Sequence, residues 1–454
     1  MVNWRQDAFQ RRSAARATAS ASLLALTLAG LLTGTAAAGA GTAATATVPA
    51  SSGATTLRLA APAASAGYVG TWAASPQPPT PSALVGPTDF SARGFADQTV
   101  RQVVHTSMGG SSLLLRFSNA FGDRPVRIGP VTVGLAAGGG RVVAGTVHRV
   151  TFSGRSSTVL PRGAEFYSDP VVMATGADSN LSISLYLPQA TGPATYHSLA
   201  QQTNFVGAGD RSSQPDASGF GTTTNNWYFL DGVDVAGAAR ASVVAVGDSI
   251  TDGYASTPDA NDRWPNFLAQ RLQARPGNRL SVVDAGISGN RVLHNSACFG
   301  TSLLSRFDRD VLSQDGASTI IMIEGINDLG FSQLPNDGCF TPNTSVSAAQ
   351  VIAGYRQVLT RAHLHGLRVL GGTLTPFKGA AYWSPRAEAK REAVNTFIRT
   401  SGAFDGVVDF AAAIADPARP AMMAPGYDSG DHLHPNDAGY AAMAAAVNLR
   451  QLTP

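Results

Sequence analysis

The sequence changes character near Gly237, and this change constrains the fold more than any other feature. After it, short apolar runs alternate with longer segments in which apolar residues recur at helical spacing. The predicted strands span residues 241–246, 280–285, 319–323, 368–373 and 407–410, and the predicted helices span 264–275, 302–313, 347–365, 385–401 and 436–449. Such alternation is typical of an α/β fold, with a parallel sheet and helices on both of its faces.

The preceding part of the chain has a different texture. Between residues 68 and 237, short runs rich in β-branched and aromatic residues are separated by Gly, Asn, Asp and Pro, without a helical period. The runs span residues 99–106, 112–117, 126–133, 142–151 and 181–187. We expect an antiparallel β-sandwich accessory domain over 68–237, with a jelly roll as one option, followed by an α/β domain over 238–454.

The first 40 residues have the pattern of a secretory signal peptide. Arginines precede an apolar run from Leu23 to Leu32, and small residues follow it. A membrane anchor is the alternative, but this run is shorter than the roughly 20 residues that a span needs. We therefore expect a secreted, extracellular protein with no stable membrane insertion after cleavage, and a flexible low-complexity spacer over residues 41–67.

The charge balance argues against nucleic acid as a partner. Four arginines but only one acidic residue lie in residues 1–40, and the remainder of the chain has equal numbers of basic and acidic side chains. Charged residues make up 14% of the sequence, and no basic stripe stands out. Electrostatic attraction to nucleic acid or to an anionic membrane is therefore not supported.

The chain has two cysteines, Cys298 and Cys339. In an oxidising compartment they are expected to form one disulfide, and two separate buried thiols are the alternative.

Reactive residues follow three of the predicted strands, and a further group lies before the last helix. The strand ends carry Gly247-Asp248-Ser249-Ile250, Gly286-Ile287-Ser288-Gly289-Asn290 and Gly325-Ile326-Asn327-Asp328, and the loop carries Asp431-His432-Leu433-His434-Pro435. Because the carboxyl ends of parallel strands share one edge of the sheet, we expect these residues to meet there.

These residue types fit acyl transfer. A serine hydroxyl becomes nucleophilic when an imidazole accepts its proton, and a carboxylate fixes the tautomer of that imidazole. Ser249, His434 and Asp431 are the predicted catalytic nucleophile, base and orienting acid. The backbone N–H groups of Ser249 and Gly289 and the side-chain amide of Asn327 are the predicted oxyanion-hole donors.

These motifs resemble those of the SGNH hydrolases, also called GDSL esterases and lipases. The resemblance covers roughly residues 240–450 and includes the Gly-Asp-Ser-Ile block, Gly289, the G-x-N-D block and the D-x-x-H-P block. It implies a flavodoxin-like three-layer αβα sandwich and ester hydrolysis without a cofactor or a metal. The substrates implied are small-molecule or polysaccharide esters, from acylated sugars to lipids. The β-rich part resembles the N-terminal region of some two-domain bacterial members.

Two other functions are compatible with single features of the chain. The protein could be a catalytically inactive, secreted polysaccharide-binding protein, although an inactive domain need not keep the whole set of reactive residues. It could also be a metal-dependent hydrolase that uses Asp431, His432 and His434, but that arrangement leaves Ser249 without a role. We expect His432 to be a partly exposed loop residue.

Several polar residues near these motifs have two interpretations. Asp248 and Asp328 are expected to brace their turns by accepting backbone N–H bonds. Asp252 and Arg263 either touch substrate or lie on the surface. His197 and the polar run at 201–204 either line a carbohydrate cleft or pack on the catalytic domain.

Overall fold

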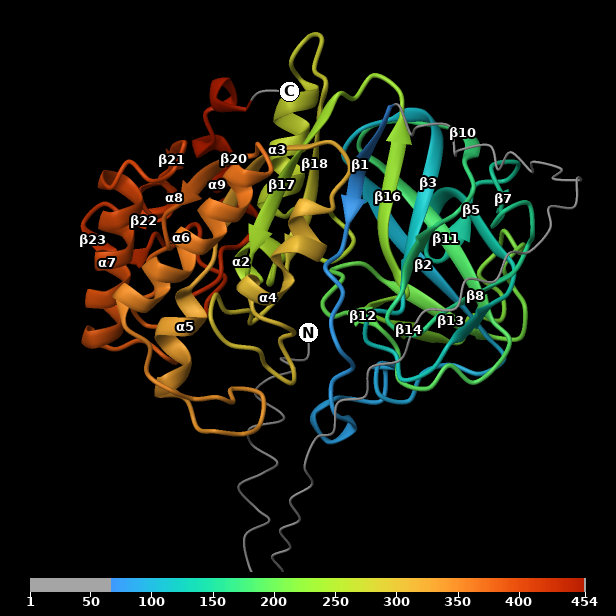
Figure 1. Ribbon diagram of the computed structural model, residues 1–454, viewed down its shortest axis with the longest axis horizontal. Helices are drawn as coiled ribbons and strands as arrows, with labels where there is room; N and C mark the ends of the chain where they lie inside the picture. Colours follow the sequence, from blue (N-terminus) through green and yellow to red (C-terminus); the bar gives the residue numbers. More distant parts are fainter. Residues whose placement is uncertain (1–66, 453–454) are drawn as a thin grey trace, which may run out of the picture. The chain divides into compact units, whose positions relative to one another are not determined.

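The computed structural model describes residues 67–452, with an N-terminal β region followed by a C-terminal α/β region (Figure 1). The predicted signal peptide, and the predicted spacer up to residue 66, lie outside the described residues. Both fold classes expected from the sequence are confirmed.

The β region contains two large antiparallel sheets. The larger sheet has the strand order β14 (Thr222–Thr224), β13 (Asn204–Ala208), β2 (Gln98–Thr106), β11 (Ser179–Leu187), β5 (Val131–Gly138) and β6 (Arg141–Val142). A further strand, β7 (His148–Val150), also pairs with β5. The other sheet has the strand order β1 (Tyr68–Ala73), β16 (Leu230–Ala236), β3 (Gly110–Ser118) and β10 (Val171–Thr175). A further strand, β9 (Glu165–Tyr167), also pairs with β3. Two small pairs, β12 (Tyr196–His197) with β15 (Trp227–Tyr228) and β4 (Val126–Ile128) with β8 (Thr158–Leu160), and one 3-10 turn, η1 (Ser82–Leu84), complete this region.

Strand alternation explains how these sheets enclose a core. In β11, Leu181, Ile183 and Leu185 are fully buried, and in β10 buried and exposed residues alternate without exception. Side chains of one parity therefore face the apolar interior.

Two predicted β runs are each divided in the structure. The run at 126–133 becomes β4 and β5 because Gly129-Pro130 lies in its middle, and proline has no N–H for a ladder bond. The run at 142–151 becomes β6 and β7.

The α/β region has a parallel sheet of five strands. Its order is β18 (Leu280–Gly286), β17 (Ala241–Gly247), β19 (Ala317–Ile323), β20 (Arg368–Gly372), β21 (Gly406–Val408). Numbered along the chain this order is 2-1-3-4-5, which is the flavodoxin-like arrangement. A short hairpin of β22 (Ala415–Asp416) and β23 (Arg419–Met423) lies outside this sheet.

Six of the helices form two contacting sets. One comprises α3 (Trp264–Gln273), α8 (Phe410–Ile414), α9 (Asp437–Ala446), and the other comprises α4 (Leu303–Phe307), α6 (Ala348–Leu364), α7 (Pro385–Thr400). Helix α4 continues into a π-helical turn, η2 (Asp308–Leu312), and shorter elements are α2 (Ser249–Asp252), α5 (Ile326–Gly330), η3 (Phe331–Gln333), η4 (Leu449–Gln451). None of the helices described between residues 67 and 452 is long and apolar enough to cross a bilayer.

Local signals set the helix ends. Ser347 caps α6, since its side chain accepts from the N–H of Gln350 while the Gln350 side chain accepts from the N–H of Ser347. Asn436 caps α9 in the same position, but this helix ends at Ala446, three residues before the predicted end. The last predicted strand is also shorter, because Phe410 begins α8 after the N-cap Asp409.

The β region covers the open edge of the parallel sheet. Strand β18 pairs only with β17 on one side, and on the other side the N–H of Val282 donates to Ser107 Oγ at 3.0 Å. Ser281 Oγ donates to the carbonyl of Gly70 in β1 at 2.6 Å. An uncovered edge strand would present unpaired backbone groups, so these contacts make the β region part of the structural support of the parallel sheet.

Candidate active site

Ser249 lies directly after the first strand of the parallel sheet. Strand β17 ends at Gly247, and Asp248 caps the short helix α2 by accepting the N–H of Ile250 at 3.0 Å. A side chain at position 247 would lie 2.2 Å from the carbonyl oxygen of Ile323, so only glycine fits this turn. Ser249 therefore begins a sharp strand-to-helix turn, as the sequence motif predicts.

The loop before α9 fixes the histidine that faces this serine. Asp431 Oδ1 accepts the backbone N–H groups of Leu433 and His434, each at 2.9 Å. Asp431 Oδ2 lies 2.6 Å from His434 Nδ1, and His434 Nε2 lies 2.8 Å from Ser249 Oγ. A proton on Nδ1 satisfies the carboxylate and leaves Nε2 to accept from the hydroxyl, which is the tautomer that a general base needs.

The electrostatics of this loop favour an ionised Asp431. Burial alone would raise the pKa of this carboxyl, but its hydrogen bonds and charge interaction with His434, together with the backbone N–H bonds, lower the pKa below its ordinary value. The carboxylate thus remains available to stabilise a positively charged His434.

Tyr254 packs on the histidine, a contact that the sequence analysis missed. Its ring centroid lies 4.2 Å from that of His434, and its carbonyl accepts the hydroxyl of Tyr440 at 2.7 Å. The only signal in the sequence is that Tyr254 follows Ser249 by five residues.

The two remaining predicted oxyanion residues lie on turns that contact each other. Gly289 has a φ of +78°, and a side chain there would overlap the ring of Phe299 at 2.4 Å. Asn327 lies in the first turn of α5, where its Nδ2 donates to the carbonyl of Asn290 at 2.9 Å and its Oδ1 accepts from the hydroxyl of Tyr382 at 3.2 Å. The Asn327 amide is therefore held beside the residue that follows Gly289.

Two aspartates tie the strand-end turns together. The Asp252 carboxylate, in α2, accepts the N–H of Ser288 at 2.7 Å. The Asp328 carboxylate, in α5, accepts the N–H groups of Val292 at 2.7 Å and Leu293 at 3.1 Å. The turns that carry Ser249, Gly289 and Asn327 consequently form one connected unit.

Residues 245–442 match the GDSL-like Lipase/Acylhydrolase family. The C-terminal domain belongs to this family. The protein is accordingly a serine hydrolase that acts on ester bonds.

Solved structures of similar proteins align with less than half of the chain. An acetylxylan esterase from Geobacillus stearothermophilus is 24% identical with a TM-score of 0.35, over 47% of this chain and 94% of its own. A GDSL-like lipase from Bacteroides thetaiotaomicron is 20% identical with a TM-score of 0.33, over 45% of this chain and 85% of its own. A search among curated proteins gave no match.

Near the turn that carries Ser249, the GDSL-like domain buries a group of acidic side chains. Asp248 and Asp328 accept backbone N–H bonds, as expected of residues that brace turns. Burial raises the pKa of Asp248 to about 7 and that of Asp328 to about 6. Arg306, fully buried beside them, donates to the carbonyl of Gly247 at 3.0 Å and lies 3.5 Å from Glu324. These buried charged groups therefore bond to the backbone of the turns and of the strand end.

His432 does not join the group around Ser249. Its Nδ1 lies 2.6 Å from Asp428 Oδ2, and its side chain is about half exposed. His432 and His434 therefore each pair with a different aspartate. Within residues 67–452, no group of three or more His, Cys, Asp or Glu side chains has the arrangement of a metal site.

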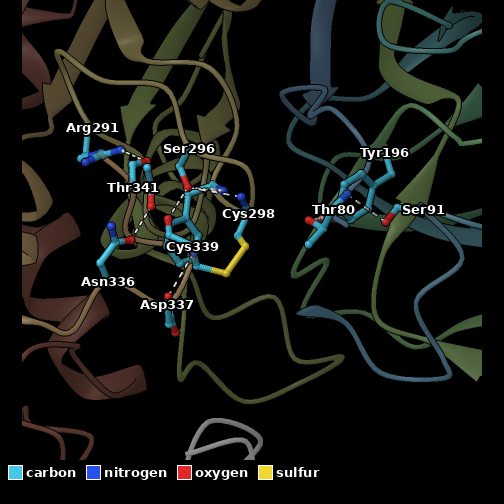
Figure 2. The surroundings of a disulfide bond; sticks show 11 residues. Thr80, Ser91, Tyr196, Arg291, Ser296, Cys298, Asn336, Asp337, Cys339 and Thr341 are labelled. Atoms are coloured by element: carbon cyan, nitrogen blue, oxygen red, sulfur yellow. Dashed lines mark hydrogen bonds between the residues drawn. A yellow bond between two sulfur atoms is a disulfide. The ribbon is translucent and has the colours of Figure 1, made fainter. Parts of the chain in front are cut away.

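The expected disulfide between Cys298 and Cys339 is present (Figure 2). Figure 2 shows Ser296 beside it, and Ser296 Oγ donates to the carbonyl of Cys339 at 2.5 Å. Phe299, which packs over Gly289, directly follows Cys298. The bridge thus joins the loop after β18 to the loop after α5, close to both predicted oxyanion turns.

The polar residues of the β region pack on the GDSL-like domain. His197 contacts Asp252, and Gln201 Nε2 donates to the carbonyls of Gly253 and Ser256, each at 3.0 Å. Asp252 and Arg263 are both buried rather than surface residues. For His197 and the polar run at 201–204, the structure therefore supports the interpretation that they pack on the GDSL-like domain.

Proposed function

We propose that the protein is a secreted esterase in which Ser249 is the nucleophile, His434 the general base and Asp431 the residue that orients it. The observation that carries this proposal is the continuous chain of hydrogen bonds from Ser249 Oγ through His434 to Asp431, at 2.8 and 2.6 Å. Secretion is supported by the signal-like pattern of residues 1–40 and by the disulfide.

The reaction follows from this geometry in two stages. Ser249 Oγ attacks the ester carbonyl carbon while its proton passes to His434 Nε2, and the carbonyl oxygen becomes an oxyanion. When the carbon–alkoxy bond breaks, the alcohol leaves with the proton from His434, and the acyl group remains on Ser249. Water then attacks the acyl-enzyme with His434 again as the base, which releases the acid and restores the serine.

The oxyanion is assigned to the N–H groups of Ser249 and Gly289 and the amide of Asn327. Support comes from the bonds that hold these turns, namely Asp252 to the N–H of Ser288 and Asn327 to the carbonyl of Asn290. Donors fixed before the reaction stabilise the developing charge without reorganising, and the loss of one such donor typically costs about 3–4 kcal/mol.

The substrates proposed are small-molecule or polysaccharide esters, and the mechanism uses no cofactor. Every step is carried by side chains and backbone groups of the GDSL-like domain. The family description, lipase and acylhydrolase, supports an acyl ester as the bond that is cleaved.

Hydrolysis of a short-chain aryl ester tests the proposal when it is measured with and without a serine-directed phosphonate, and with and without a chelator. Loss with the phosphonate alone is the expected result. Loss with the chelator alone would instead indicate a metal-dependent hydrolase that uses Asp431, His432 and His434. No hydrolysis of any aryl ester would indicate a binding protein.

A further inference from the structure

A histidine of the β region contacts the GDSL-like domain at the turn that carries the nucleophile. His197, in β12, is 4% exposed, and its Nε2 lies 3.1 Å from Asp252 Oδ1. Its Nδ1 lies 2.8 Å from the carbonyl oxygen of Ser75. The imidazole is thus held between two oxygen acceptors.

A proton on each ring nitrogen would satisfy both acceptors. A backbone carbonyl and a carboxylate both accept, so a neutral imidazole would satisfy one of them and face the other with a lone pair. Burial alone would lower the pKa of His197, but the charge of Asp252 and the hydrogen bonds to Asp252 and Ser75 raise it above its ordinary value. The geometry and the charges therefore both favour an imidazolium paired with Asp252.

Asp252 links this cation to a predicted oxyanion turn. While Oδ1 faces His197, Oδ2 accepts the backbone N–H of Ser288 at 2.7 Å. Ser288 directly precedes Gly289, and Asp252 lies three residues after Ser249 on α2. Helix α2 packs tightly here, since a side chain at Gly286 would lie 2.4 Å from the backbone nitrogen of Asp252. One carboxylate thus joins the β region, the nucleophile helix and the turn of Gly289.

Arg263 and Asp284 are charged groups that also lie near this link. Arg263 Nε donates to the carbonyl of Asp252 at 2.7 Å and lies 4.0 Å from Asp284. These residues, with His197 and His105, are among those that line a small cavity of about 30 Å³ between the β region and the GDSL-like domain. The cavity has room for about one water molecule, so it is too small to be a substrate pocket.

We propose that His197 is a positioning residue of the esterase reaction, which acts through Asp252 to hold the Ser288–Gly289 turn with the Gly289 N–H directed at the oxyanion. This inference rests on the proposed function. It makes the β region part of the catalytic apparatus, because a group from outside the GDSL-like domain sets the position of an oxyanion donor. Without the imidazolium, the buried Asp252 carboxylate loses its partner and the turn is free to shift.

The test compares His197→Leu with Gln202→Leu. Gln202 lies on the same cavity and donates to Asn261 Oδ1 across the same boundary, at 2.5 Å, whereas the two Asp252 carboxylate oxygens pair with His197 and Ser288. We expect His197→Leu to lower kcat about 10- to 100-fold with KM unchanged, since the turn acts only on charge in the transition state. Gln202→Leu should keep kcat within about twofold. Both variants are assayed well below their own melting temperatures.

Two further measurements separate positioning from general stability. His197→Gln keeps an N–H donor for Asp252 and should retain a kcat between those of the wild type and His197→Leu, which also provides a readout if the leucine variant does not fold. The pair is present while His197 is protonated and is lost as the pH rises through its raised pKa, so wild-type kcat should fall as this proton is lost. The glutamine variant should lack this fall.

An unchanged kcat in both His197 variants, or a rise in KM alone, would overturn the proposal. An equal loss of kcat in Gln202→Leu would also overturn it, because that loss would come from loosening the boundary as a whole. Ser249→Ala in the same assay distinguishes failure of the proposed function from failure of the inference about His197. If that variant still hydrolyses ester, Ser249 is not the nucleophile, whereas if it is inactive while the His197 variants are fully active, only the inference about His197 fails.

Discussion

The two regions of this protein contribute to the active site in different ways. All the groups proposed to touch the substrate lie on turns of the α/β region, whereas the β region supplies contacts that hold those turns and the edge of the sheet. A polar contact between the regions can therefore change stability, turnover or both, depending on whether it reaches a strand-end turn. The comparison teaches that the reacting groups lie in one part of the chain, whereas part of their support comes from another.

The largest effect is expected from Ser249→Ala in the α/β region. Because the nucleophile is removed, kcat should fall by at least about 10³-fold, the scale of triad deletions. The melting temperature should stay close to that of the wild type, since the hydroxyl's partner, His434, keeps its bonds to Asp431. A residual kcat within tenfold of the wild type would assign the nucleophile elsewhere.

The two histidines of the loop before α9 sharpen the comparison within the α/β region. His434→Ala should reduce kcat by several orders of magnitude, because no other base contacts Ser249 Oγ in the part of the chain that the structure describes. His432→Ala is the matched control and should change kcat by less than about tenfold, because this side chain is half exposed and bonded to Asp428. The reverse ranking would exchange their roles.

Asn327→Ala tests the third oxyanion donor. We expect kcat to fall by about 10²–10³ with little change in KM, since the amide acts on charge that develops in the transition state. Steady-state kinetics on an aryl ester measure both constants. A raised KM with unchanged kcat would mean that Asn327 binds the ground-state ester.

Replacement of Cys298 and Cys339 by serine should affect stability and activity together. The bridge spans 41 residues, for which chain entropy alone gives about 4 kcal/mol. Loosening the loop also frees Phe299 above Gly289, so kcat should fall severalfold well below the melting temperature. Calorimetry and kinetics on the same sample measure the two effects, and an unchanged kcat would leave the bridge a structural role only.

The smallest effect is expected in the β region, from Ser107→Ala. This change removes the acceptor of the Val282 N–H on the edge strand, which costs about 1–3 kcal/mol and should lower the melting temperature by a few degrees without changing kcat. Ser111→Ala, at an exposed position of β3, is the matched control and should leave the melting temperature unchanged. Equal melting temperatures for the two variants would contradict the proposed role of Ser107 in supporting the edge strand.

The sequence predicted the α/β region well because its signals are local. Strands β17 and β19 each contain a run of four apolar residues, and the motifs that follow them identify the candidate residues before any contact is known. Helices α2 and α5 were missed because four or five residues show no helical period. Strand β16 was missed because Asp231 and Asp234 interrupt its apolar pattern, although both are buried near Arg116.

The supporting contacts could not be predicted for a different reason. His197 lies in a short polar stretch whose sequence is equally compatible with a sugar-binding loop, and only its distance to Asp252 distinguishes the two. Ser107 is one of many serines in the chain, and its role depends on the position of β18. Such contacts join residues far apart in the sequence and carry no local periodicity or motif.

The most direct test of the account is to find where a serine-directed phosphonate attaches. The wild-type protein is inactivated with about one equivalent of the reagent, digested and examined by peptide mass spectrometry. We predict one phosphonate on Ser249, with labelling that parallels the loss of ester hydrolysis and is strongly slowed in His434→Ala. A label on another residue, or full inactivation without modification of Ser249, would contradict the account.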